Sequence, residues 1–190
     1  MRVKTRWNVK DKPRSIEEIA GALGFILWRI ACNGVLDLEN ENFQTDDLRQ
    51  RLDVISAFLV FLIHTVDRLA YERFDQEQRE ALIRSLALRV VSILEDNARD
   101  TAGEERRREA FIDALNAGMN EYAELEYGPD GPSFSYLRFF AAEVAGAMGP
   151  RDNQWIIDHV MAVEGPEALE TLSKAMESLT GGLAADKTGS

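Results

Sequence analysis

Cysteine and histidine are almost missing from this chain of 190 residues, which contains one cysteine and two histidines. The single cysteine, Cys32, cannot form a disulfide within the chain, so the fold must be stable without one. The repeated cysteine and histidine patterns of structural zinc sites need more ligands than the sequence supplies. We therefore expect no bound metal and no cofactor, and a reducing, cytoplasmic location.

Motifs of the common enzyme classes are missing too. The sequence has no glycine-rich phosphate loop, no nucleophile elbow and no His-Glu-x-x-His pair. It also lacks the repeated Glu-x-x-His of carboxylate-bridged metal bundles. These absences favour a non-catalytic role.

Sustained strand alternation is lacking, whereas apolar residues recur at helical spacing along most of the chain. Ser15 with Glu18, and Asp75 with Gln78, have the spacing of capping boxes that begin helices. A second helix is expected to start at Thr45 or Asp46 and to end near Phe74. The sequence therefore predicts an all-α fold, a compact bundle of six to seven helices with a flexible basic N-terminal arm.

Proline and glycine mark the boundaries of this organisation. Residues 127–133 contain two prolines and two glycines, which cannot continue a helix. We expect long helices over about 15–126 and shorter ones over 134–181, within one helical domain spanning 15–182. Residues 183–190 read as a disordered tail.

Charge is unevenly distributed along the chain. The net charge is −11, yet residues 1–14 hold six basic residues and one acidic residue. The rest of the chain is therefore more acidic than the total, and an acidic body repels phosphate backbones. We expect nucleic acid to be an unlikely partner, with the arm either solvated or docked on the acidic body.

The apolar segment 19–36 is nearly long enough to span a membrane. Arg29 lies at its middle, where insertion of an arginine costs about 2.5–3.5 kcal/mol. The helix-starting residues 15–18 do not resemble the flank of a signal peptide. We therefore predict a buried core helix, with no membrane span and no signal peptide.

The strongest candidate site is a polar stripe that follows the apolar run of the second helix. His64, Asp67, Arg68 and Tyr71 stand at i, i+3, i+4 and i+7, which places them on one helical face. A histidine oriented by an aspartate can act as a base, and an arginine can bind a carboxylate or phosphate.

The same stripe is also consistent with a polar network that ties helices together. In that interpretation Arg68 pairs with a carboxylate on another helix, such as Glu121, Glu124 or Asp158. We favour this interpretation because ion-pair networks cluster ionisable groups as readily as active sites do.

A second candidate site consists of Asp158 and His159, which lie in the apolar stripe Trp155–Val163. A core or interface histidine is the favoured interpretation here. The sequence as a whole predicts a non-catalytic interaction protein, such as an adaptor, assembly factor or regulatory partner, which forms a homodimer. The alternative is a small-ligand or anion-binding protein, or an enzyme, that uses the stripe on the second helix.

Overall fold

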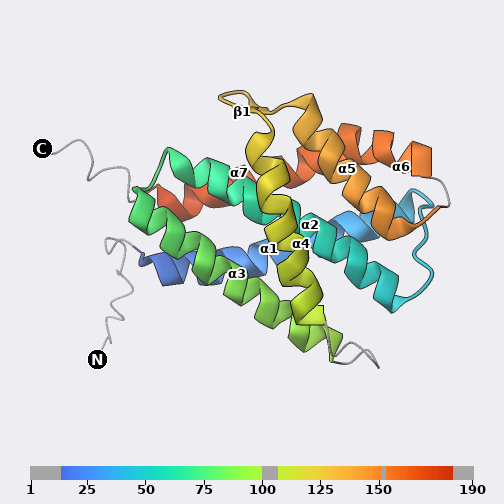
Figure 1. Cartoon of the computed structure of the whole chain (residues 1–190), viewed down its shortest axis with the longest axis horizontal. Helices are drawn as coiled ribbons and strands as arrows, with labels where there is room; N and C mark the ends of the chain where they lie inside the picture. Colours follow the sequence, from blue (N-terminus) through green and yellow to red (C-terminus); the bar gives the residue numbers. More distant parts are fainter. Residues whose placement is uncertain (1–13, 100–106, 151–152, 182–190) are drawn as a thin grey trace, which may run out of the picture.

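Helices make up nearly all of the computed structural model, which describes residues 14–99, 107–150 and 153–181 (Figure 1). A hairpin of two very short strands lies between the fourth and fifth helices, and a π-helical turn, η1, joins the last two helices into one continuous run. The elements are α1 (Ile16–Asn40), α2 (Leu48–Tyr71), α3 (Gln76–Ala98), α4 (Arg107–Glu124), β1 (Tyr127–Gly128), β2 (Gly131–Pro132), α5 (Phe134–Met148), α6 (Asn153–His159), η1 (Val160–Glu164) and α7 (Gly165–Thr180).

The predicted fold class is confirmed: the protein is an all-α compact bundle. Its described residues form six or seven helices, according to whether the α6–η1–α7 run is counted once or twice. The hairpin replaces the plain loop expected at 127–133. The arm up to residue 13 and the tail from residue 183 lie outside the described residues.

Helix α2 occupies the centre of the bundle. It packs against α1, α3, α4, α5 and α7, and Figure 1 shows it running through the middle of the molecule. From Phe58 to Ile63 every side chain is buried. A helix that is apolar on all sides can be stable only inside a protein or a membrane, which explains why the other helices surround it.

The helix starts follow from local capping. Ser15 with Glu18 and Asp75 with Gln78 form the two predicted capping boxes. The second helix begins slightly later than predicted, because the Asp47 carboxylate accepts the hydrogen bond from the Gln50 amide. Each cap satisfies a backbone N–H that the helix itself leaves unpaired.

Two helices cross closely at Gly34, which lies inside α1 before its end at Asn40. A Cβ atom at Gly34 would lie 2.5 Å from Cε1 of Phe58 on α2, so glycine is required here for close contact with the neighbouring helix. A Cβ at Gly24 would lie 2.5 Å from Cγ of the Arg89 side chain, whereas no atom lies within 4 Å of a Cβ at Gly21.

Helices α4 and α5 meet near the hairpin and diverge away from it (Figure 1). Aromatic rings join them at the meeting point, where the Tyr122 ring lies 4.8 Å from both Tyr136 and Phe139. Beneath, Phe61 of α2 stacks on Phe140 at 4.0 Å. Farther from the hairpin, α4 packs chiefly against α2 and α3 rather than against α5.

Two large apolar side chains that follow the helical spacing of apolar residues are exposed: Trp155 by 72% and Met119 by 55%. The reason is that α4 and α6 lie at the outside of the bundle, where a broad apolar stripe extends beyond the buried face.

By length and composition alone, α1 and α2 could each cross a membrane. In this structure 50% of the apolar window of α1 and 61% of that of α2 is buried inside the protein. Enclosed core helices give the same pattern, and the expectation that neither spans a membrane stays a prediction.

The crossing at Gly34 yields a prediction with an internal control. Gly34→Ala forces the Phe58 ring to move in a packed core, so the free energy of unfolding should fall by about 1–2 kcal/mol despite the gain in helix propensity. Gly21→Ala, which meets no atom, should raise it by about 0.5–1 kcal/mol. Urea denaturation of both variants measures the difference, and a stabilising Gly34→Ala would contradict the close crossing.

Candidate functional site

His64, the first residue of the predicted polar stripe, lies half-buried between α2 and α4. Its Nε2 atom is 3.2 Å from the Leu115 carbonyl oxygen, and its ring lies 5.0 Å from that of Tyr122. Burial lowers the pKa of His64, more than the Leu115 carbonyl and Asp67 raise it. A neutral imidazole that donates to a backbone carbonyl connects α2 to α4.

Arg68 binds the C-terminal end of α4. Its Nη2 atom donates to the carbonyl oxygens of Tyr122, Ala123 and Leu125 at 2.7, 3.0 and 3.4 Å. Carbonyls at a helix C-terminus lack intrahelical partners and carry partial negative charge, so a guanidinium is a favourable cap. The expected carboxylate partner was wrong: within the described residues the acceptors of Arg68 are backbone oxygens.

Asp67 points to α3 instead of α4. Its two carboxylate oxygens accept hydrogen bonds from Nε and Nη2 of Arg79 at 2.6 and 2.8 Å. This two-point geometry fixes the orientation of both groups. Tyr71 is 70% exposed, and the Arg79 guanidinium lies 5.4 Å from the centre of its ring.

The stripe therefore faces two cavities rather than one. His64 lines a cavity of about 580 Å³ between α3 and α4. Arg68 and Tyr71 line another of about 590 Å³, beneath the β1–β2 hairpin. The Asp67–Arg79 pair belongs to both linings and separates them. The sequence spacing correctly placed the four residues on one helix. Their contacts with other elements, however, distribute them between two cavities.

The second candidate pair is separated as well. Asp158 is exposed, whereas His159 turns inward, where its ring lies 5.4 Å from that of Phe43. Its Nε2 atom is 3.2 Å from the Oε1 atom of Glu164, a carboxylate only 3% exposed. Glu164 is the last residue of the π-helical turn η1, which begins directly after His159, and the sequence pattern did not indicate it.

No group of three or more potential metal-ligating side chains is found within 14–99, 107–150 and 153–181. The expected absence of a metal stays a prediction for the complete chain.

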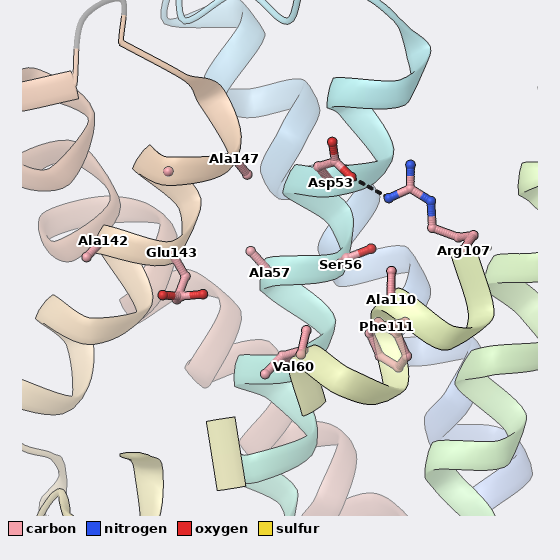
Figure 2. Close-up of a pocket in the computed structure, with 12 residues that line it drawn as sticks. Asp53, Ser56, Ala57, Val60, Arg107, Ala110, Phe111, Ala142, Glu143 and Ala147 are labelled. Atoms are coloured by element: carbon pink, nitrogen blue, oxygen red, sulfur yellow. Dashed lines mark hydrogen bonds and ion pairs between the residues drawn. The ribbon is translucent and has the colours of Figure 1, made fainter. Parts of the chain in front are cut away.

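A third cavity, of about 310 Å³, was not predicted from the sequence. Figure 2 shows it between α5 on one side and α4 on the other, with α2 as its floor. Its walls are mainly small or apolar, and its polar groups lie at the margins. The lining residues used below are Asp53, Ala57, Val60, Arg107, Ala110, Ala114, Ala142, Glu143 and Gly146.

Arg107 fixes one end of this cavity, which we call the α4–α5 groove. Its guanidinium pairs with the Asp53 carboxylate (Figure 2), and the side chain is only 7% exposed. The pair attaches the first turn of α4 to α2. Alanines and glycines give no chemical signal in a sequence, so only the divergence of α4 and α5 reveals the groove.

Comparison with protein-family models, curated proteins and solved structures gives no significant match.

The Arg68 cap predicts a measurable contribution to stability. In Arg68→Gln the α4 carbonyls lose a charged donor, so the free energy of unfolding should fall by about 1–3 kcal/mol. Arg138→Gln changes an exposed arginine on α5 and should have little effect. Equal stability of the two variants in chemical denaturation would show that the cap contributes nothing.

The buried Glu164 predicts a pH dependence. Burial raises the pKa of Glu164 from 4.5 to about 7, while the hydrogen bond with His159 opposes the rise and Asp37 adds to it. The folded protein thus holds this proton more tightly than the unfolded chain. Its contribution to stability is complete below the unfolded value and is lost as the pH rises through about 7.

Relative to Glu164→Gln, wild-type protein should therefore lose roughly 1–3 kcal/mol of stability between about pH 5 and pH 8. Thermal unfolding over this pH range measures the effect. Asp158→Asn, at the exposed neighbouring carboxylate, should leave the wild-type pH profile unchanged. If Glu164→Gln and wild-type protein show the same pH profile, the raised pKa of Glu164 is contradicted.

Proposed function

We propose that this protein is a non-catalytic interaction module whose α4–α5 groove binds a basic, apolar helical segment of a partner protein. The observation that carries the proposal is the groove itself: two diverging helices with small side chains above an apolar floor. Amphipathic helices commonly bind their targets in grooves of this kind.

The walls permit close approach of another backbone. Ala110 and Ala114 stand one helical turn apart on α4, and Ala142 and Gly146 stand one turn apart on α5. All four are exposed and carry at most a methyl group, so these positions leave the space between α4 and α5 open. Large apolar side chains from a partner can therefore reach the floor.

Charge favours a basic partner. Glu143 is exposed and projects over the groove from α5 (Figure 2). Within the described residues it has no ion-pair partner, whereas the Asp53 carboxylate at the other end is already bound by Arg107. A net charge of −11 adds a long-range attraction for cationic segments.

The groove does not depend on a catalytic group. Its charged residues lie at the margins, and the hydroxyl of Ser56 on the α2 floor donates a hydrogen bond to the Leu52 carbonyl oxygen. This composition fits the absence of enzyme motifs in the sequence. A homodimer, in which a second copy occupies the groove, remains the alternative occupant.

The test uses a synthetic amphipathic peptide of leucine and lysine, labelled with a fluorophore. Wild-type protein should raise its anisotropy with a dissociation constant in the micromolar range, and Ala114→Trp should weaken binding at least about tenfold because the indole fills the groove. Ala123→Trp is the matched control, because Ala123 is exposed on α4 and does not line the groove.

Two outcomes would overturn the proposal. One is equal binding by Ala114→Trp and Ala123→Trp, which would place the peptide elsewhere. The other is a concentration-dependent dimer, measured by light scattering, that Ala114→Trp converts to monomer, because the groove would then be occupied by a second copy. Loss of binding when glutamate replaces lysine in the peptide would support the role of charge.

A further inference from the structure

The cavity beneath the hairpin is separate from the α4–α5 groove and differs from it in chemistry. It has a volume of about 590 Å³ and is formed by the end of α2, the β1–β2 hairpin and one face of α7. This volume lies in the range of roughly 300–1,000 Å³ that is typical of small-molecule sites. Its lining is rich in charged side chains, and their arrangement indicates which kind of ligand the cavity can bind.

Three half-buried arginines line this cavity: Arg79 is bound to Asp67, and Arg68 and Arg73 supply the remaining positive charge. Arg68 uses Nη2 for the α4 carbonyls, and Arg73 uses Nη1 for the Leu69 carbonyl at 2.6 Å. Within the described residues, their remaining N–H groups have no protein acceptor, and neither arginine pairs with a carboxylate. A guanidinium has five N–H donors, so both retain donors for a further acceptor.

The carboxylates of the lining lie farther out. Glu72, Asp130 and Glu177 are exposed, whereas the arginines, Tyr127 and Ser173 are half-buried. The fourth carboxylate, Asp67, is already bound by Arg79 on two points. Apart from the Asp67 carboxylate bound by Arg79, the half-buried charged groups of the lining are thus cationic, and its exposed charged groups are anionic.

We propose that this cavity binds a small zwitterion of the amino-acid class, with its carboxylate on Arg68 and Arg73 and its ammonium group near the carboxylates at the mouth. Arginine binds carboxylates with directional, charge-assisted hydrogen bonds. A simple anion would meet the repulsion of the acidic mouth on entry. A simple cation would meet the arginines inside, so a ligand with both charges matches the cavity best.

The hairpin adds the polar and aromatic part of the site. Tyr127 packs edge-on against Tyr136 at 5.4 Å, which places it on the wall rather than in solvent. Burial raises the pKa of Tyr127, and the positive charge of Arg73, which lines the same cavity, opposes the rise. The tyrosine hydroxyl and the Ser173 hydroxyl can both hydrogen-bond to a bound ligand.

Isothermal calorimetry with the standard L-amino acids, added singly to the full chain, tests the proposal. At least one should bind wild-type protein, and Arg73→Gln should weaken that binding at least about tenfold through loss of a charged contact. Glu177→Gln should weaken it less, because the carboxylate is exposed and screened. Arg138→Gln should bind as wild type does.

Ligand analogues separate the two charges. The amide and the N-acetyl derivative of the best amino acid should each bind more weakly, since each lacks one charge. Inorganic phosphate that binds while no amino acid does would overturn the proposal in favour of a plain anion site. Absence of any amino-acid binding, or binding that Arg73→Gln leaves unchanged in a folded variant, would also overturn it.

Discussion

Burial of α2 on all sides is the constraint on which the rest of the structure depends. Five helices must lie against it, and one of them, α1, can approach only because Gly34 leaves room for Phe58. The apolar side chains in the middle of α2 need only packing contacts with the surrounding helices. Its last third is polar, and an enclosed polar group must be hydrogen-bonded to avoid a large desolvation cost. That requirement explains the contacts of Asp67 with α3 and of Arg68 with α4.

These attachments determine where the surface remains open. Helix α4 is attached at its start by Arg107 and at its end by Arg68 and the aromatic rings around Tyr122. Between these points it buries only Phe111 and Gly118, so its other face is available to form the α4–α5 groove. The same Arg68 cap holds the hairpin over the end of α2, where it covers the cavity lined by Arg68 and Arg73. Both proposed binding surfaces thus follow from how α4 is held on α2.

The sequence predicted features that depend on neighbouring residues in the chain. The capping boxes at Ser15 and Asp75 and the presence of the second helix rest on local spacing along the chain. Features that depend on tertiary packing were missed. Arg68 was expected to meet a carboxylate but binds carbonyls, because spacing along α2 cannot show which end of α4 lies opposite. The buried Glu164 also gave no signal, since its hydrogen bond with His159 requires the π-helical turn that begins after His159.

Native-state hydrogen exchange tests the central claim most directly, because it measures how firmly each helix is held. The account predicts that amides in the middle of α2 exchange only through global unfolding. Amides in the middle of α4, between its two attachments, should exchange at least about tenfold faster through local opening. Equal protection of the two helices, or faster exchange in α2 than in α4, would contradict the account of a central α2 with a lightly attached α4.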